Sequence, residues 1–397
     1  MTFIRRDANP NKIADEVFVL SKKAKEDKDP KKINATIGSI LDENEELVAF
    51  KSVFETFDAL DDKDKARYAD NFEGNKDYLE AVYKHVLEGQ VDLPHRLVAT
   101  SGGTGAITLA FKNILERGDQ VLLPHIAWGA YKTIAEDHAL KVTTYNTFDV
   151  DDLILKAHEL CKRQDKLLIV INSPCHNPTG FAFDLAMWDK LIKALEVIEK
   201  PCVILNDIAY LDYTYDLKKG REYLKLFNEI GANTMVIIAF SLSKTFTSYG
   251  LRTGADIILA RNKEDVDALA NVFERSCRAL WSNVNNAAMM TFAKVMRDKR
   301  EEFLLEKDGY IKMLKKRSDL FLKELDAYHI PYYPYNDGFF ITISFKDNQK
   351  RDNVHELLLK RHVYTLRVNL GIRIAICSVP YNKLKDLSLI LKEVLEK

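Results

Sequence analysis

The chain has 397 residues, with 58 lysines and arginines against 59 aspartates and glutamates, so its formal charge is −1. This balance provides no positive field for nucleic acid or for an anionic membrane, and we expect neither partner. Hydrophobic residues make up 47% of the chain and charged residues 29%, a globular composition that excludes a disordered, collagen-like or coiled-coil protein.

The longest apolar stretches, 167–171 and 235–240, are far shorter than the roughly 20 residues that span a bilayer. The N-terminal region is charged from Arg5 onward and has no continuous apolar segment of the kind that a secretory signal contains. We therefore expect a cytoplasmic protein. Its five cysteines are odd in number, widely spaced and never in a C-x-x-C pair, which predicts buried free thiols and no metal site.

Short apolar runs recur from residue 96 onward, separated by helix-compatible segments. They lie at residues 97–99, 121–123, 142–145, 167–171, 202–205, 236–240 and 257–259. Several are apolar at consecutive positions, as strands buried on both faces require, and most connections are long enough for a crossover helix. The sequence therefore predicts an α/β fold whose mostly parallel sheet has seven strands. Ligands of such sheets bind beyond the carboxyl ends of the strands.

After about residue 295 the pattern changes. A long helix is predicted over 294–325, a strand over 339–345 with its odd-numbered residues on one face, and a closing amphipathic helix over 384–395. These elements predict a second, smaller α+β domain. Residues 1–45 contain too little apolar sequence for a core of their own. We expect residues 1–45 to pack on the small domain, residues 46–295 to form the large domain, and residues 296–397 to form the small one.

A glycine-rich segment, residues 101–105, follows the first apolar run. Glycines allow a ligand to approach the backbone, and a helix start offers unpaired N–H donors, so a phosphate fits there. An ordinary turn between strand and helix is the other interpretation, because the segment matches neither G-x-G-x-x-G nor the P-loop pattern. The run at 236–240 is followed by two hydroxyls, an amine and a guanidinium, from Ser241, Ser243, Lys244 and Arg252. This set suits a phosphate beside a reactive amine, while a solvated surface lysine is the alternative.

Three further loops after strands carry polar or aromatic residues. Trp128 could stack on a flat ring or serve only for packing. Asn177 offers an amide in a loop that prolines make rigid, and its neighbour His176 is interpreted as structural because no second metal ligand accompanies it. Asp207 ends a buried strand, where a carboxylate is costly without a cationic partner or several donors.

Together these motifs resemble the pyridoxal-phosphate aminotransferases of the aspartate aminotransferase family, class I and fold type I. The resemblance extends from about residue 34 to Arg373 and keeps the family's order and near-family spacing. It rests on Asn177-Pro178-Thr179-Gly180, Asp207 with Tyr210, Ser241-x-Ser243-Lys244 with Arg252, and Arg373. The family's fold, a seven-stranded cofactor domain with a small domain made by both termini, agrees with the predicted elements.

By this resemblance pyridoxal 5'-phosphate is the cofactor, and Lys244 carries the Schiff base and moves the proton. Asp207 would keep the pyridine nitrogen protonated, so that the ring can act as an electron sink. Tyr210, the third implied catalytic residue, would hydrogen-bond the ring's phenolic oxygen together with Asn177, and Trp128 would stack on the ring face. The phosphate would be held by Gly103, Thr104, Ser241, Ser243 and Arg252.

The resemblance also implies a substrate site. Arg373 would bind the α-carboxylate through its guanidinium, near Gly38, Trp128 and Asn177. Arg278 would reach in from the neighbouring subunit and bind a second carboxylate. Tyr68, with Tyr78 and Tyr83 nearby in the sequence, matches the tyrosine that contacts the phosphate across the dimer. A homodimer with shared active sites is therefore expected.

Two positions depart from the family pattern. Relatives near this branch often have a histidine behind the pyridine-binding aspartate, and here that position is Tyr131. Val284-Asn285 stands in place of the usual paired prolines.

The expected reaction is a ping-pong transamination between an amino acid and a 2-oxo acid, with 2-oxoglutarate as the acceptor. The donor is aspartate or an aromatic amino acid, and the sequence leaves this choice open. A C–S or other β-lyase of the same fold is an alternative, and a non-catalytic cofactor-binding sensor is a second one.

Overall fold

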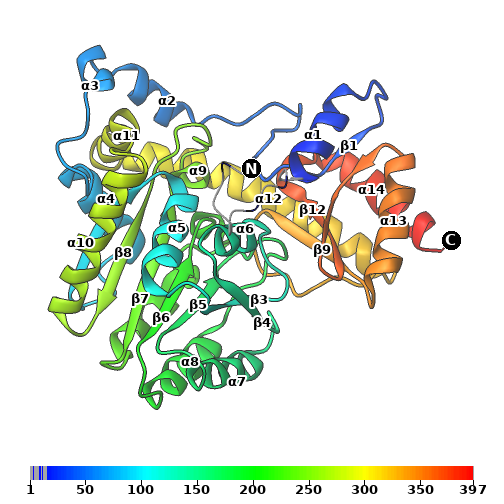
Figure 1. Ribbon diagram of the computed structural model, residues 1–397. Coiled ribbons are helices and arrows are strands. Elements are labelled where there is room, and N and C mark those ends of the chain that lie inside the picture. The colour runs from blue at the N-terminus through cyan, green and yellow to red at the C-terminus, as the bar shows by residue number, and fades with distance from the viewer. Residues whose placement is uncertain (1–2, 4–8, 10, 12–15, 397) are drawn as a thin grey trace.

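The computed structural model describes residues 3, 9, 11 and 16–396, and its largest element is a seven-stranded sheet (Figure 1). The strand order is β2-β8-β7-β6-β5-β3-β4, and β8 alone runs antiparallel to its neighbours. All seven predicted strands are confirmed. They are β2 (His95–Thr100), β3 (Gln120–Pro124), β4 (Lys141–Tyr145), β5 (Leu167–Asn172), β6 (Cys202–Asp207), β7 (Thr234–Ser241) and β8 (Gly254–Ala260).

Helices cover both faces of this sheet, which explains why its strands are apolar at consecutive positions. Every residue of β5, β6 and β8 is buried. Along β5, Leu168 and Val170 belong to one core, whereas Leu167, Ile169 and Ile171 belong to the other. The first core contains side chains of α5 (Gly102–Ile114), α6 (Ala130–Asp137) and α10 (Lys263–Leu280), and the second those of α4 (Lys76–Leu87), α7 (Val150–Cys161) and α8 (Leu185–Glu196).

A smaller α+β unit is formed by segments near both ends of the described chain, whose blue and orange-to-red ribbons lie side by side in Figure 1. Its antiparallel sheet has the order β11-β12-β9, from Leu366–Val368, Gly371–Ala375 and Phe340–Ser344, and α13 (Asn348–Lys360) and α14 (Tyr381–Leu395) contribute to its core. Near the N-terminus, α1 (Glu16–Glu26) precedes β1 (Ile33–Asn34), which pairs with β10 (Val363–Tyr364). Ile341, Ile343 and Phe345 share this core as predicted, whereas Phe339 packs in the core of the large sheet.

The helix predicted over 294–325 consists of two helices. Lys299 separates α11 (Asn286–Asp298) from the long α12 (Arg300–Ala327). Phe303 of α12 packs in a core of the large sheet and Phe321 packs in that of the small unit. Helix α12 therefore belongs to both units. The domain boundaries at residues 45 and 295 stay predictions.

The remaining elements are short. They are α2 (Lys51–Asp58), α3 (Asp62–Ala66), α9 (Leu242–Thr245) and the 3-10 helices η1 (Leu211–Tyr213), η2 (Lys219–Glu229) and η3 (Ile376–Ser378). All five cysteines are buried and free, as predicted. Of the helices in the described part of the chain, none has the length and apolar character to cross a membrane.

Candidate active site

The predicted polar residues meet at the carboxyl edge of the large sheet. Asp207 is the last residue of β6, and β7 ends at Ser241, directly before the helical turn that carries Lys244. Asn177 lies in the loop after β5, and Arg373 faces this edge from β12 of the small unit. The site is therefore built between the two units.

Lys244 is enclosed, which excludes the solvated surface lysine. Its Nζ donates a hydrogen bond to the carbonyl oxygen of Gly38 at 2.8 Å. The same atom lies 4.7 Å from the ring centroid of Tyr249 and 5.6 Å from that of Tyr210. Burial, together with the charges of nearby arginines, lowers the pKa of Lys244 from 10.5 to about 8. The amine is thus partly unprotonated near neutral pH, as a nucleophile requires.

Asp207 is buried between two neutral donors. The Tyr131 hydroxyl donates to Oδ2 at 2.5 Å, and the Ala209 N–H donates to Oδ1 at 3.0 Å. Burial raises the pKa of Asp207, and these two hydrogen bonds oppose the rise. Within the chain, a phenol and an amide thus serve as donors to Asp207, and a protonated ring nitrogen would supply the cationic partner.

Tyr131 lies directly behind Asp207, at the position of the departure from the family pattern. It belongs to the first turn of α6, and its ring makes an edge contact with Trp128, with 5.4 Å between centroids. Tyr131, which stands where relatives often have a histidine, therefore keeps a hydrogen-bond donor beside the Asp207 carboxylate.

The start of α5 and the loop after β7 form a cradle that fits a phosphate. Gly102 has a φ of +71°, and a Cβ there would lie 2.6 Å from Nη2 of Arg252. A Cβ on Gly103 would lie 3.1 Å from Cβ of Ser241. Nη1 of Arg252 donates to Oγ of Ser243 at 3.0 Å. Helix N–H groups, two hydroxyls and a guanidinium thus converge, and glycine at 102 is what admits the guanidinium.

Arg373 forms a buried clamp suited to a carboxylate. Nη1 donates to Oδ1 of Asn177 at 3.1 Å and Nη2 donates to the carbonyl oxygen of Thr36 at 2.5 Å. Its Cζ lies 4.3 Å from the ring centroid of Phe340, which holds the guanidinium plane in place. A Cβ on Gly38 would lie 2.8 Å from Phe340, so glycine lets that segment pass between Phe340 and Lys244.

Two of the predicted residues lie away from this cluster within one chain. Arg278, in the last turn of α10, is exposed, donates to Oγ of Ser282 at 2.5 Å, and has its Cζ 4.9 Å from the Phe72 ring centroid. Tyr68 is 81% exposed, between α3 and α4. The contribution of both residues across a dimer stays a prediction. The other predicted residues lie in the segments that meet at the sheet edge, and they are Gly38, Gly103, Thr104, Trp128, Asn177, Asp207, Tyr210, Ser241, Ser243, Lys244, Arg252 and Arg373.

The structure adds residues to which the sequence assigned no role. Tyr249 packs against the Lys244 amine, and its hydroxyl accepts a hydrogen bond from the Ile40 N–H at 3.0 Å. Phe340 lies under Arg373. The alternation of the strand at 339–345 was a signal for Phe340, since it places this residue on the face opposite the small core.

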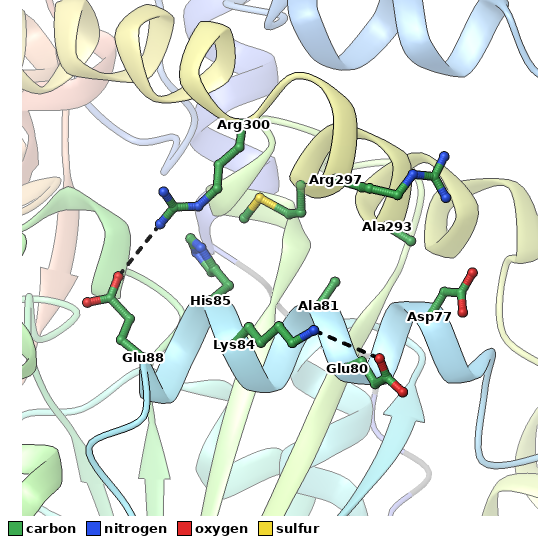
Figure 2. Close-up of a pocket in the computed structure, with 10 residues that line it drawn as sticks. Asp77, Glu80, Ala81, Lys84, His85, Glu88, Ala293, Arg297 and Arg300 are labelled. Carbon is green, nitrogen blue, oxygen red and sulfur yellow. Dashed lines mark ion pairs between the residues drawn. The ribbon is translucent and has the colours of Figure 1, made fainter.

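A separate cavity of about 720 Å³ lies between α4 and the helices α11 and α12, and none of the predicted site residues lines it (Figure 2). On its rim, Glu88 pairs with Arg300 at 4.0 Å and Glu80 pairs with Lys84 at 3.9 Å. These four charged groups are therefore paired with one another, while Arg297, also in the lining, pairs with Asp298 outside it. His85 also lines it.

Comparison with known proteins connects this geometry to one family. The family model described as "Aminotransferase class I and II" matches residues 30–387. The aspartate aminotransferase of Escherichia coli K12 is 27% identical over 283 residues, which cover 68% of this chain and 70% of that protein. The tyrosine aminotransferase of Rhizobium meliloti is 27% identical over 270 residues, covering 66% of this chain and 67% of that one.

Solved structures agree with the sequence comparisons. An aminotransferase from Anaerococcus prevotii has a TM-score of 0.95 at 30% identity, and the match covers 100% of both chains. The aromatic-amino-acid aminotransferase of Burkholderia pseudomallei, solved covalently bound to pyridoxal phosphate, has a TM-score of 0.82 at 20% identity, also over 100% of both chains. At 20% identity, this similarity shows only that the two chains share a fold.

Proposed function

We propose, from the premise that this chain belongs to the class I and II aminotransferase family, that it transfers the amino group of aspartate or an aromatic amino acid to 2-oxoglutarate. The enzyme is an aminotransferase of the aspartate and aromatic type, and its cofactor is pyridoxal 5'-phosphate. One observation carries the proposal. The Lys244 amine is buried and held on the Gly38 carbonyl oxygen at 2.8 Å, and its burial, with the charges of Arg373 and Arg252, lowers its pKa to about 8.

Lys244 serves as nucleophile and as acid and base. When bound, pyridoxal 5'-phosphate supplies an aldehyde that takes up amino groups and a protonated ring that accepts the electrons of the Cα–H bond. Lys244 would bind the aldehyde between turnovers, and its Nζ would take the proton from the substrate Cα once the substrate amine has displaced it. With a pKa of about 8, about one amine in ten is unprotonated at pH 7.

The groups around Lys244 would orient the cofactor. Asp207 would hold the proton on the ring nitrogen, while its contact with Tyr131 fixes the direction of the carboxylate. Trp128 would cover one ring face. Asn177 and Tyr210 would hydrogen-bond the phenolic oxygen. The phosphate would be held by Gly103, Thr104, Ser241, Ser243 and Arg252.

Arg373 would bind the α-carboxylate of donor and acceptor in turn, because its guanidinium offers paired donors in one plane. Since one lysine and one arginine serve both substrates, the first product must leave before the second substrate enters, which is a ping-pong cycle. In the proposed homodimer, Arg278 would bind the second carboxylate and Tyr68 would contact the phosphate, each in the partner's site.

Purified protein incubated with pyridoxal 5'-phosphate, 2-oxoglutarate and one amino acid at a time tests the proposal. We expect glutamate from aspartate or an aromatic donor, and none from the Lys244→Ala variant. Release of pyruvate and ammonia without an oxo-acid acceptor would instead indicate a β-lyase. Absence of glutamate with all twenty amino acids would contradict transamination.

A further inference from the structure

Four ionisable side chains meet in the interior, beside the segment that carries Tyr210. Asp212 lies in η1, and its Oδ1 accepts a hydrogen bond from Nη2 of Arg221 at 2.6 Å. Its Oδ2 lies 2.9 Å from Nε2 of His85 and 3.2 Å from Nζ of Lys307. None of the four side chains is more than 4% exposed. The cluster thus joins α4, η1, η2 and α12, and its His85 also lines the cavity of Figure 2.

The charges in this cluster follow from burial. Burial alone would raise the pKa of Asp212, but His85, Lys307 and Arg221 lower it well below its ordinary value. Burial lowers the pKa of Lys307 to about 8 and also lowers that of His85. His85 is therefore neutral at pH 7, and Nε2 carries its proton because a carboxylate only accepts. A buried carboxylate with two hydrogen-bond donors, His85 and Arg221, and an ion pair to Lys307 is held firmly, since any displacement leaves charge without compensation.

The η1 turn connects this cluster to the candidate site at two points. Tyr210 directly precedes the turn, and its ring lies 5.6 Å from Nζ of Lys244. Tyr213 closes the turn, and its hydroxyl donates to the backbone carbonyl oxygen of Lys244 at 2.9 Å. Asp212 lies between these two tyrosines. Because η1 is only three residues long, the position of Asp212 constrains both contacts.

Helix α12 extends the connection to the other side of the site. Lys307 reaches Asp212 from this helix, and Nη1 of Arg317, also on α12, donates to the Cys377 carbonyl oxygen at 3.0 Å. Cys377 lies in η3, directly after the strand that carries Arg373. One helix therefore contacts the segments behind both the amine and the carboxylate clamp.

We propose that Asp212 is a positioning residue of the active site: its three partners from α4, η2 and α12 fix its carboxylate, and η1 transmits that position to Tyr210 and to the Lys244 backbone. This inference rests on the proposed function, in which Tyr210 and Lys244 contact the cofactor. Asp212 itself touches neither cofactor nor substrate.

Three variants of the full chain, loaded with pyridoxal 5'-phosphate, test this role. Tyr213→Phe removes the hydrogen bond to Lys244, Lys307→Met removes one cation, and Asp212→Asn removes the carboxylate charge. The readouts are the pH midpoint of the cofactor's visible absorption and its dissociation constant. We expect the midpoint to move by about 0.5 pH unit or more and cofactor binding to weaken about threefold or more, because the Tyr210 and Lys244 contacts lose alignment.

Two further variants serve as controls. Tyr145→Phe also deletes a buried hydroxyl that donates to a backbone carbonyl at 2.9 Å, that of Val170 in the sheet, and it should leave the midpoint unchanged. Lys307→Arg keeps a cation and should restore the wild-type midpoint. Thermal unfolding of each variant shows whether it has folded.

The proposal is overturned if Lys307→Met and Tyr213→Phe fold and match Tyr145→Phe in midpoint and in cofactor affinity. A shift in Tyr213→Phe alone would also overturn it, since the turn would then be independent of the charges. If Asp212→Asn does not fold, the midpoint and the cofactor affinity of Lys307→Met decide whether the proposal holds. A wild-type protein that binds no cofactor and forms no glutamate contradicts the proposed function, whereas an active wild type with unshifted variants contradicts only the role of Asp212.

Discussion

The hydroxyl of Tyr131 lies 2.5 Å from Oδ2 of Asp207, and the two side chains are 0% and 5% exposed. Burial raises the pKa of Tyr131 well above 10, so the phenol keeps its proton throughout the working pH range. A histidine side chain, by contrast, has an ordinary pKa near 6.5, so its charge can change within the range in which enzymes work. Tyr131 therefore supplies Asp207 with a donor whose charge does not change with pH.

Tyr131→Phe should weaken cofactor binding by about fivefold to one hundredfold, because a buried carboxylate oxygen loses its donor at a cost of about 1–3 kcal/mol. The measurement is titration of the apoprotein with pyridoxal 5'-phosphate, followed by visible absorption. Tyr145→Phe loses a hydroxyl that is bonded only to the Val170 carbonyl and is the matched control. Equal affinities for the two variants would show that Asp207 does not depend on Tyr131.

The apoprotein should take up pyridoxal 5'-phosphate faster as the pH rises, up to about pH 8, the pKa to which burial lowers Lys244. The sign follows from the chemistry: the unprotonated amine attacks the aldehyde, and its fraction grows with pH until the pKa is passed. An ordinary lysine, with a pKa of 10.5, would give a rise that continues about 2.5 pH units further. Stopped-flow absorption between pH 6 and pH 11 distinguishes the two, with Lys244→Ala as the blank.

The sequence predicted the seven strands because burial on both faces leaves consecutive apolar residues, a signal that is local. The order of those strands has no such signal, since it depends on where each crossover returns the chain. The antiparallel direction of β8 also came only from the structure. The break at Lys299 was missed because both α11 and α12 carry helical sequence up to that residue.

The sequence predicts the position of a site residue when that residue ends a strand or directly follows it along the chain. Asp207, Ser241 and Lys244 lie where their motifs place them, at the carboxyl edge of the sheet. The contacts between motifs were not predictable. Tyr131 meets Asp207, and Lys307 meets Asp212, only because the fold brings separate elements together, and no pattern in either segment records the partner.

Arg373→Lys should lower kcat/KM for every amino acid about tenfold to one hundredfold, because the paired donors to the α-carboxylate are reduced to one point charge. Steady-state kinetics with aspartate and with an aromatic donor measure the loss. Cofactor affinity should fall far less, since lysine keeps the positive charge near Lys244 and Arg373 has no part in the phosphate cradle. Arg361→Lys, which alters an exposed pair with Glu393, is the matched control. A loss confined to aspartate or to aromatic donors would mean that Arg373 binds the side chain of the substrate rather than its α-carboxylate.

Arg278→Leu should distinguish dicarboxylate from aromatic donors. Loss of a charged hydrogen bond of about 1.5–3 kcal/mol predicts a fall of about tenfold or more in kcat/KM for aspartate, with aromatic donors spared. The ratio of the two kcat/KM values is the measurement. Arg275→Leu, an exposed arginine on the same helix α10, is the control. Equal losses for both donors would make Arg278 structural.

Mixed dimers should reveal whether Arg278 acts across the subunit interface. Within its own chain this arginine is exposed and contacts Phe72 and Ser282, which suits a residue that serves a neighbouring site. Lys244→Ala and Arg278→Leu chains, each poorly active on aspartate alone, should regain activity when unfolded together and refolded. In the mixed dimer, one site combines an intact Lys244 with the intact Arg278 of the other chain. If Arg278 instead acted in its own chain, each site would lack one of the two residues, and aspartate turnover would stay at the level of the separate variants.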